Sequence, residues 1–466
     1  MVGQMTAVLD PSALSTFRDA FAGAIIEPND DRYDAARVVW NGMFDRRPAL
    51  IVRPTGQADV ITAVRFARER GLDIAVRGGG HSIPGFSTCD DGLIVDLSAM
   101  RGVRVDPDRR IAWANGGTLL SELDHEAQAF GLACPVGVVS HTGVAGLTLG
   151  GGMGRLMRRH GLTIDNLRSV DLVTADGRLV HASDDENPDL FWGMRGAGAN
   201  FGVVTSFEFR LHPVGPEIVR GTVIHPVERA HELVALFREF VESSPDEVMT
   251  TFAIGPAIPA EDFPAEIAGR PIALISALHC GSLAAAERDF AGLRAFGTPV
   301  MDTFGPTTYL AAQHLNDGPE LDWGHRFYMK SGYFSDLPDD LIDGCIGAVE
   351  RAPGDCTFSF WAWGRAIAET AEDATAFNRR DAAFWGSAEV MWDDPAQDAS
   401  YVGWAKDAMA MLQPFTMPGR YVNDVVEMGD DVVRSIYGDA KYERLRALKR
   451  AWDPDNVFHL NQNIRP

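Results

Sequence analysis

The chain has 466 residues, of which 42 are lysine or arginine and 65 are aspartate or glutamate, so its formal net charge is -23. Such a charge would repel a phosphate backbone, and the densest basic cluster, at residues 155–159, is only a few residues long, which excludes nucleic acid as a partner. Hydrophobic residues make up 46% of the chain, and 466 residues are too many for one core. We therefore expect a globular protein of two domains.

Cysteine usage and targeting segments bear on the compartment. The five cysteines are spread over the chain without a CxxC pair, which favours a reduced cytoplasmic setting. Residues 1–10 lack the basic segment and apolar run of a signal peptide, and no stretch approaches the ~20 apolar residues of a membrane span. We expect a cytoplasmic protein with no membrane partner.

Several common catalytic motifs are missing from the sequence. It contains no GxxxxGK[ST], no strict GxGxxG, no HExxH and no GxSxG. P-loop NTPases, zinc proteases and serine hydrolases of the common kinds are therefore disfavoured, and we expect no metal site.

The first part of the chain alternates between helical and extended patterns. Residues 57–70 place apolar side chains on one helical face, and Gly71 is placed to end this helix. A second helix is expected over residues 119–130, with Thr118 as its N-cap. The other expected elements are a helix at 12–21, strands at 49–52, 73–76, 93–97 and 203–211, and hairpins at 101–114 and 169–181.

The composition changes at about residue 214. From there to residue 419 the glycine clusters vanish and prolines and aromatic residues become frequent. Extended runs separated by helical runs predict an antiparallel sheet with helices, which is a second domain. The expected strands are 219–224, 250–254, 273–278, 326–334 and 357–363, and the expected helices are 230–241, 283–295 and 341–351.

Two glycine-rich turns at strand ends carry the strongest chemical signal. In residues 77–82 (RGGGHS), three glycines leave backbone amides unshielded by side chains, and Arg77 and Ser82 can add donors. Residues 146–154 (GLTLGGGMG) repeat this pattern. A single glycine cluster is more often a tight turn, but two in one domain favour a long cofactor with two phosphates.

Three separated motifs carry a family resemblance. They are residues 76–82 (VRGGGHS), residues 143–154 (GVAGLTLGGGMG) with 160–167 (HGLTIDNL), and residues 442–445 (YERL) with 453–464 (DPDNVFHLNQNI). The chain resembles the berberine-bridge-enzyme-like FAD-linked oxidases of the vanillyl-alcohol-oxidase flavoprotein superfamily. The likeness covers nearly the whole chain. It implies an α+β fold of two domains, with an FAD-binding domain made from residues 1–213 and 425–466 and an antiparallel-sheet substrate domain at residues 214–424.

The resemblance also implies how the cofactor is held. FAD is expected to be bonded covalently through His81 to the flavin 8α carbon, while a histidine capping a turn is the alternative interpretation. For His141 and His160 we prefer hydrogen-bonding or structural roles. In relatives with a second covalent bond, the cysteine occupies the position of Val139, so Cys134 is out of register and one bond is expected. The alternative is that a loop shift brings the Cys134 sulfur near flavin C6, where it would form a second bond.

The residues expected at the cofactor come from both glycine turns, the segments that follow them and the C-terminal tail. They are Arg77, Gly78, Gly79, Gly80, His81, Ser82, Val139, His141, Thr142, Gly143, Gly146, Leu147, Gly150, Gly151, Gly152, Gly154, His160, Asp165, Asn166, Leu167, Gly202, Val203, Val204, Tyr421, Asn461 and Asn463.

The catalytic candidates follow from the same resemblance. Tyr421 and Asn423 resemble the family's Tyr-x-Asn strand, which faces the isoalloxazine ring. A phenol with a pKa of ~10 is a poor base unless a neighbour stabilises its phenolate, and Lys330 is the candidate for that neighbour. The alternatives are that Tyr421 only packs and that Lys330 is a surface residue. Tyr328 completes the expected catalytic set.

Large aromatic side chains gather in the expected substrate domain. Strand 357–363 carries Phe358 and Phe360 on one face and Trp361 and Trp363 on the other, so one set can line a pocket. Such rings are more often part of a core.

The predicted activity is that of an FAD-linked oxidase. It transfers a hydride from a small alcohol, amine or phenol-type substrate to flavin N5, with O₂ as acceptor and H₂O₂ as product, and the flavin carries the redox chemistry. A flavin-dependent oxygenase, an oxidative cyclase of secondary metabolism and a catalytically decayed flavin-binding protein remain alternatives.

Overall fold

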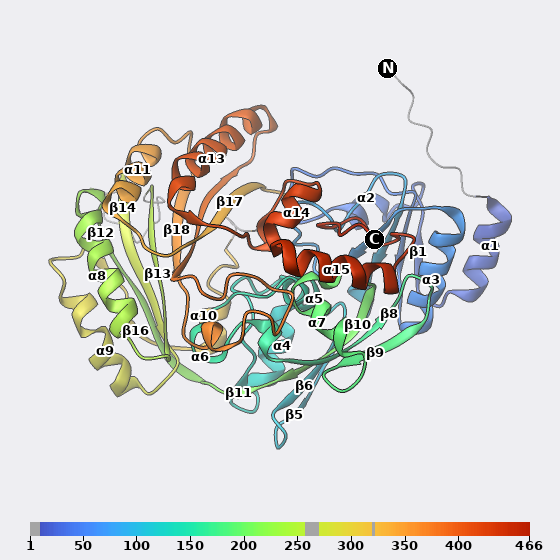
Figure 1. Cartoon of the computed structure of the whole chain (residues 1–466), viewed down its shortest axis with the longest axis horizontal. Helices are drawn as coiled ribbons and strands as arrows, with labels where there is room; N and C mark the ends of the chain where they lie inside the picture. The colour runs from blue at the N-terminus through green and yellow to red at the C-terminus, as the bar shows by residue number, and fades with distance from the viewer. Residues whose placement is uncertain (1–9, 257–269, 319–321) are drawn as a thin grey trace.

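A computed structural model describes residues 10–256, 270–318 and 322–466 of the chain (Figure 1). A four-stranded sheet lies near the N-terminus, in the order β1-β2-β4-β3, and strands β2, β4 and β3 are parallel. Because β3 ends at the first glycine turn, the sheet places that turn at its edge. The strands are β1 (Ala24–Ile26), β2 (Leu50–Arg53), β3 (Ile74–Arg77) and β4 (Leu93–Asp96), and the nearby helices are α1 (Pro11–Ala20), α2 (Tyr33–Arg37) and α3 (Gln57–Arg70).

Helix α3 confirms the predicted helix at 57–70. Its apolar residues Val60, Val64 and Ala67 are fully buried against the sheet. Gly71 ends the helix at φ +64°, a left-handed conformation that suits glycine, and its N–H caps the last turn.

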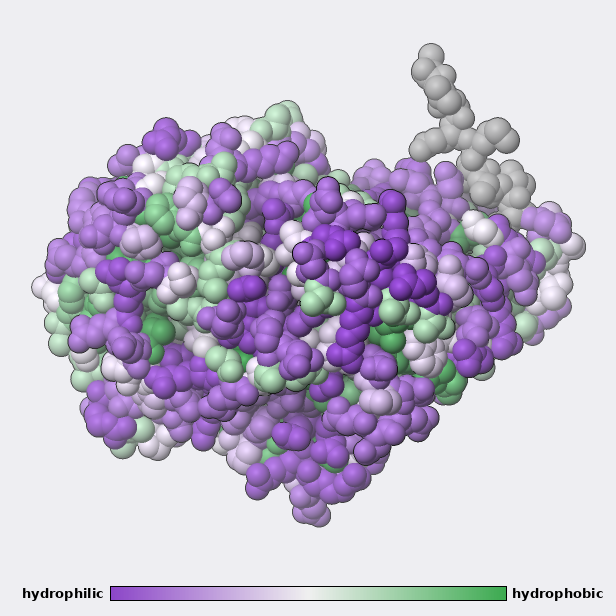
Figure 2. Space-filling model, viewed as in Figure 1, coloured by the Kyte–Doolittle hydropathy of each residue, from purple (hydrophilic) through white to green (hydrophobic). Residues whose placement is uncertain are grey.

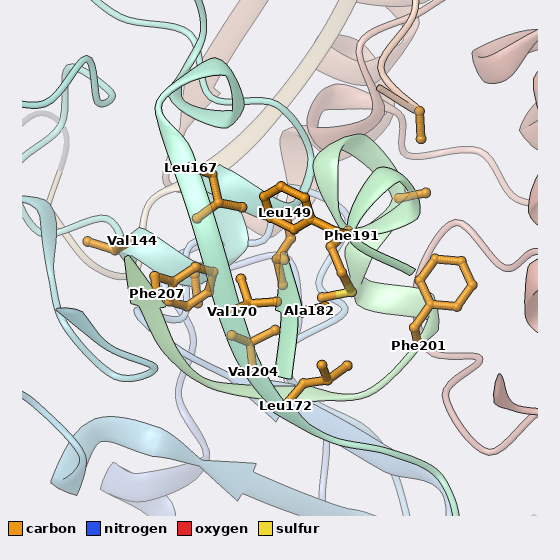
Figure 3. Packing of buried hydrophobic residues seen from close by; sticks show 14 of the residues in the cluster. Val144, Leu149, Leu167, Val170, Leu172, Ala182, Phe191, Phe201, Val204 and Phe207 are labelled. Atoms are coloured by element: carbon orange, nitrogen blue, oxygen red, sulfur yellow. The ribbon is translucent and has the colours of Figure 1, made fainter. Parts of the chain in front are cut away.

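A five-stranded antiparallel sheet follows, in the order β5-β6-β10-β8-β9. Figure 3 shows side chains such as Val170, Phe191 and Phe207 gathered between this sheet and the helices that cover it. The elements are β5 (Val103–Asp106), β6 (Ile111–Asn115), β8 (Leu167–Val173), β9 (Leu179–Ser183), β10 (Val203–Arg210), α4 (Leu120–Gln128), α5 (Val144–Leu149), α6 (Met157–His160) and α7 (Pro188–Ala197), with β7 (Leu132–Ala133) paired to β11 (His212–Pro213).

The N-terminus of α4 differs from the prediction that Thr118 caps it. The N-cap is Leu119, whose backbone N–H donates to Glu122 Oε2 at 2.8 Å. The Thr118 hydroxyl bonds instead to the backbone of Gly102, because the two segments pack side by side.

The third sheet has nine strands, and those on its main path run β15-β12-β14-β13-β18-β19-β17-β20. Helices α8, α9, α11 and α13 cover one face, and the other face, called the inner face below, is directed toward the rest of the molecule (Figure 1). The strands are β12 (Glu217–Pro226), β13 (Val248–Pro256), β14 (Pro271–His279), β15 (Met301–Asp302), β16 (Gly305–Thr308), β17 (Arg326–Phe334), β18 (Cys356–Ala362), β19 (Phe384–Trp392) and β20 (Thr416–Met417), and the helices are α8 (Ala230–Ser243), α9 (Leu283–Ala295), α10 (Tyr309–Gln313), α11 (Asp339–Val349), α12 (Ala366–Glu369) and α13 (Asp398–Leu412).

The predicted strands of this sheet are confirmed within a few residues at their ends. Strand β19 and helix α13 were not anticipated by the sequence analysis. Both are central, since β19 pairs with β17 and β18 and α13 packs on the outer face.

The C-terminal segment returns to the first half of the chain. Helices α14 (Asp430–Tyr437) and α15 (Asp439–Trp452) contribute Val433, Ile436 and Leu445 to the core of the five-stranded sheet. The outer core of the nine-stranded sheet uses only residues 219–412. This division favours the predicted domain arrangement, whose boundaries stay a prediction.

A buried ion pair fixes the end of α15. Lys449 Nζ lies 2.6 Å from Asp453 Oδ2, and both side chains are fully buried. Lys449 also donates to the carbonyls of Asn200 and Phe458, and the Asp453 carboxylate accepts from the amides of Val457 and Phe458. The pair therefore ties residues 457–458 to the end of α15, and the bond to Asn200 ties α15 to the body of the protein.

The face of the molecule in Figure 2 is covered mostly by hydrophilic residues, with apolar residues in small groups. This agrees with the charge of -23. Within the described ranges, no helix combines the length and apolar character that a membrane crossing requires.

The Lys449–Asp453 pair yields a stability prediction. Asp453→Ala should destabilise the protein by about 3–5 kcal/mol, because it leaves the Lys449 ammonium buried and unpaired. The matched control is Asp455→Ala, which removes a 60% exposed carboxylate paired with Arg68 and should cost about 1 kcal/mol or less. Thermal unfolding midpoints compare the two, and equal midpoints would contradict the structural role of the buried pair.

Candidate functional site

A cavity of about 520 Å³ lies where the two glycine turns meet the inner face of the large sheet. Its walls come from the turn after β3, from α5 and the residues before it, from residues 196–204 and from the C-terminal tail. Strands β17, β18 and β19 complete it. The fold thus brings motifs from opposite ends of the chain to one site.

The two glycine turns touch through their backbones. A Cβ atom on Gly79 would lie 2.2 Å from the amide nitrogen of Gly143, and one on Gly143 would lie 2.3 Å from that of Gly79. Gly80 has φ +74°, where a side chain would be strained. Only glycine permits this approach, so the turns form a joint wall of backbone.

The cavity wall is rich in polar groups that lack a protein partner. Within the described part of the chain, the amides of residues 78–82 donate no backbone hydrogen bond. Ser87 Oγ, Asn461 Oδ1 and Gln462 Oε1 are buried without a partner, and Gly146 on α5 faces open space. Free amides and carbonyl oxygens along a cavity fit a dinucleotide that is bound mainly through the backbone.

The end of α10 and the residues that follow it hold the segment at residues 137–140. Gln313 Nε2 donates to the Gly137 carbonyl at 3.0 Å, and Asn316 Nδ2 donates to the Val138 carbonyl at 3.1 Å. The Ser140 hydroxyl donates to Asp317 Oδ2 at 2.6 Å. The substrate-side half of the chain therefore helps to shape the wall that faces the first glycine turn.

His81 lies in the cavity wall in a mostly nonpolar setting. Its ring stacks on Trp40 with centroids 4.9 Å apart, and its Nε2 lies 2.6 Å from Nδ1 of His141. Burial, and secondarily His141, lowers the pKa of His81 to about 3. The imidazole is therefore neutral at physiological pH and can act as a nucleophile.

Val139 stands where some relatives carry a second bonded cysteine, and its surroundings differ from those of Cys134. Val139 lines the cavity. Cys134 is fully buried in the core of the five-stranded sheet, outside the cavity wall, and burial raises its pKa well above the ordinary value. Cys134 is accordingly an unreactive core thiol.

Arg77 and His160 do not contribute to the cavity wall as predicted. The Arg77 guanidinium donates to the carbonyls of Ala36 and Ser87, so it braces the glycine turn from behind. The His160 ring stacks on His212 with centroids 3.9 Å apart and lies away from the cavity. Both side chains therefore make contacts within the protein and do not face the cavity.

Asp165 and Asn166 also have structural partners. Asp165 forms an ion pair of 2.7 Å with the buried Arg380, and Asn166 donates to the His160 carbonyl. The predicted residues in the cavity wall are Gly78, Gly79, Gly80, His81, Ser82, Val139, Thr142, Gly143, Gly146, Leu147, Gly150, Gly202, Val204, Tyr421, Asn423 and Asn461. Besides the four residues with structural partners, the predicted cofactor residues that lie outside the cavity wall are His141, Gly151, Gly152, Gly154, Leu167, Val203 and Asn463.

Tyr421 and Asn423 lie together in the cavity wall. The phenol oxygen of Tyr421 accepts from Asn423 Nδ2 at 2.9 Å and from the Gly152 amide at 3.1 Å. Burial, followed by the charge of Asp424, raises the pKa of Tyr421 above its ordinary value. Tyr421 is therefore a neutral phenol whose own proton is free to be donated.

The predicted pairing of Lys330 with Tyr421 is not found. Lys330 lies outside the cavity wall and forms an ion pair with Glu427, and burial lowers its pKa to about 8. Tyr328 belongs to a cluster with Trp392 and Tyr401. Side chains alternate along β17, so Phe327 and Met329 reach the cavity while Tyr328 and Lys330 point to the other face.

Two acidic residues in the cavity wall were missed by the sequence analysis. Glu389, on β19, and Asp424, directly after Asn423, both line the cavity. A signal existed for Glu389, since it is the one charged residue in the otherwise apolar or small stretch 384–392. Asp424 gives no comparable signal, because acidic residues are common in turns.

Burial acts on both carboxyls. The pKa of Glu389 is raised by burial, against a hydrogen bond of 2.5 Å from the Ser387 hydroxyl. The pKa of Asp424 is raised well above its ordinary value by burial, and the Glu389 charge adds to this rise while the Ser331 side chain opposes it. The cavity thus has an acidic end.

Trp361, Trp385, Phe327 and Met329 surround this acidic end. The indoles of Trp361 and Trp385 are nearly perpendicular, with centroids 6.1 Å apart. Of the expected aromatic residues, Trp361 lines the cavity, whereas Phe358 and Phe360 are in the outer core and Trp363 packs near Tyr333.

Comparison with known proteins gives matches over nearly the whole chain. Residues 48–183 match a family described as FAD binding domain, and residues 400–465 match one described as berberine and berberine like. An (R)-6-hydroxynicotine oxidase of Paenarthrobacter nicotinovorans is 32% identical over 95% of this chain and 97% of its own length. An FAD-linked oxidoreductase of Dictyostelium discoideum is 31% identical over 97% of each chain.

Solved structures confirm the predicted α+β fold with its antiparallel substrate-side sheet. The crystal structure of 6-hydroxy-D-nicotine oxidase from Arthrobacter nicotinovorans matches with a TM-score of 0.86 and 30% identity, over 96% of this chain and 98% of that one. Physcomitrella patens BBE-like 1 has the same fold, with a TM-score of 0.87, 24% identity and coverage of 97% and 99%. This chain belongs to the berberine-bridge-enzyme-like FAD-linked oxidoreductases of the vanillyl-alcohol-oxidase superfamily.

Proposed function

We propose that the protein is an oxidase that oxidises a small organic substrate with FAD and O₂ and releases H₂O₂. The observation that carries this proposal is a cavity with an amide-rich wall for the cofactor and an acidic, aromatic end for the substrate. The free and buried state of all five cysteines supports a cytoplasmic location.

The residues of the chain supply binding and orientation. The amides of residues 78–82 and the N-terminus of α5 suit the pyrophosphate, and Asn461 and Gln462 suit polar groups nearby. When bound, FAD supplies a hydride acceptor and passes the electrons to O₂.

The acidic end supplies proton transfer. Glu389 is partly exposed in the cavity, and the Ser387 hydroxyl bonded to it stabilises its charged form. Glu389 therefore takes the N–H or O–H proton that the substrate loses on oxidation. Tyr421 donates its free phenol proton as a hydrogen bond that orients the reacting group, and the surrounding aromatic rings exclude water.

The cofactor assignment is tested at Gly146. Gly146→Asp should greatly reduce the flavin content, because a Cβ at this position meets no protein atom within 4 Å and its carboxylate enters the cavity. The control is Gly292→Asp on α9, where a Cβ is equally free and flavin content should not change. Absorbance of the purified proteins gives flavin per chain, and full flavin loading of Gly146→Asp would overturn the assignment.

A second prediction concerns the covalent bond. His81→Ala should release FAD on denaturation, whereas Cys134→Ala should retain it, because Cys134 is a buried core thiol outside the cavity. Peptide mapping by mass spectrometry should find flavin on a His81 peptide of the parent protein. Flavin attached to Cys134, or retained after denaturation of the His81→Ala protein, would contradict one bond through His81.

A third prediction concerns Tyr421. Tyr421→Phe should slow anaerobic flavin reduction by about tenfold to a hundredfold, the effect of losing one buried hydrogen bond to the reacting group. The control Tyr401→Phe removes the hydroxyl of a buried tyrosine whose ring stacks on Trp392 outside the cavity. This variant should keep the parent rate.

Stopped-flow spectroscopy measures this rate with whichever member of a panel of amines and alcohols reduces the flavin. Admitting air should then yield hydrogen peroxide equimolar with the flavin. Reduction by a substrate without peroxide on reoxidation would contradict the oxidase assignment, and an unchanged rate in Tyr421→Phe would return Tyr421 to a packing role.

A further inference from the structure

The charged groups of the cavity are of one sign. Glu389 and Asp424 line it, while no lysine or arginine of the described residues does. The charge of Asp424 acts on Tyr421 and Tyr333, and burial raises the pKa of each phenol, so both are neutral. No positively charged side chain of the described cavity wall compensates a negative charge at this end.

Asp424 lines the cavity and has one buried oxygen without a partner among the described residues. Asp424 is only 7% exposed, and the oxygen without a hydrogen-bond partner is its Oδ2. The Trp385 indole N–H approaches the carboxyl without hydrogen-bond geometry and also lacks a partner. Burying an ionised carboxylate without compensation is costly, so this group holds a proton or faces a cation from outside the protein.

Each carboxyl has a serine beside it, and the two serines are cross-strand neighbours. Ser387 donates to Glu389 Oε1 at 2.5 Å, and Ser387 is the cross-strand partner of Ser331 in the β19–β17 ladder. The Ser331 side chain lies next to Asp424 and acts to lower the pKa of its carboxyl, against the rise that burial causes. Opposed side chains on one face of an antiparallel pair have Cβ atoms about 4.5–5.5 Å apart, so neighbouring hydroxyls can hydrogen bond.

We infer that Glu389 and Asp424 act as one acid pair, connected through Ser387 and Ser331, that carries a single negative charge and selects amines through one protonated nitrogen. This inference rests on the proposed oxidase function and names its substrate class. Asp424 is the protonated, positioning member, and Glu389 is the charged member that touches substrate. Two coupled carboxyls close together favour sharing one proton.

The surroundings suit an ammonium group better than an alcohol or a carboxylate. An ammonium supplies the missing compensation for the buried charge, and the indoles of Trp361 and Trp385 in the same cavity wall can add cation–π attraction. A carboxylate ligand would meet a like charge.

Glu389 serves as the base when the bound amine is oxidised. Glu389 takes one N–H proton from the bound ammonium, and the amine becomes neutral. FAD, when bound, would supply the acceptor for the hydride of the neighbouring carbon, and the nitrogen lone pair would form the C=N bond. The product is an iminium cation, which water hydrolyses or which leaves unchanged.

Binding without turnover tests the inference. Anaerobic calorimetry uses the holoenzyme with its flavin first reduced by dithionite, so that no substrate can be oxidised, and compares benzylamine, benzyl alcohol and benzoate, which share one ring and differ in charge. Benzylamine should bind about tenfold or more tightly than benzyl alcohol, and benzoate most weakly. Glu389→Gln should abolish this preference, whereas Glu427→Gln should keep it, because Glu427 lies three residues beyond Asp424 and pairs with Lys330 outside the cavity.

The acid pair itself has a spectroscopic test. Infrared spectra at neutral pH should show the carbonyl stretch of a protonated carboxyl that Asp424→Asn removes and Glu427→Gln retains. In binding, the Glu389→Gln/Asp424→Asn protein should bind benzylamine no more weakly than Glu389→Gln alone, since coupled groups are not additive. If Asp424→Asn fails to load flavin, Ser331→Ala breaks the connection instead and should shift the same band.

The outcomes separate this inference from the oxidase function. Equal binding of benzylamine and benzyl alcohol, or a preference that survives Glu389→Gln, would overturn amine selection. A carboxyl band unchanged in Asp424→Asn would overturn the pair. Peroxide formed from alcohols but not amines would leave the oxidase intact and refute the inference, whereas amine binding without flavin reduction by any compound would refute the oxidase.

Discussion

The close contact of Gly79 with Gly143 is the constraint on which the site depends. A single Cβ at either position would lie within 2.3 Å of the other backbone, so the two turns meet only without side chains. This contact joins the edge of the parallel sheet to the start of α5 and leaves the amides of residues 78–82 facing the cavity. An uncharged wall of backbone donors results, and it can hold a pyrophosphate without lysine or arginine.

The remainder of the fold keeps this wall closed and adds the substrate end. The C-terminal tail is anchored by Lys449 and Asp453 and places Asn461 against the Ala199 carbonyl at 2.8 Å. From the other side, the inner face of the nine-stranded sheet presents Glu389 beside the segment that carries Tyr421 and Asp424. The cavity therefore lies at a junction between segments distant in sequence, which explains why neither half of the chain contains its complete wall.

The sequence predicted those features that local chemistry determines. Glycine clusters after strands, the amphipathic pattern of α3 and the Gly71 cap depend on a few neighbouring residues, and the structure confirms them. The direction of a side chain across a sheet depends on strand register, and this is why Lys330 was expected at Tyr421 but faces Glu427. Strand β19 was missed because Gly386, Ser387 and Ala388 weaken its strand pattern, and Glu389 was missed with it.

The central claim is that the glycine wall holds FAD so that its reactive ring faces the acidic end of the cavity. A crystal structure of the flavin-loaded protein tests it most directly. We predict electron density for the pyrophosphate against the amides of residues 78–82 and for the isoalloxazine ring between Tyr421 and the side chains of β19. A pyrophosphate away from these amides, or a ring with Glu389 and Asp424 on the far side of a protein wall, would contradict it.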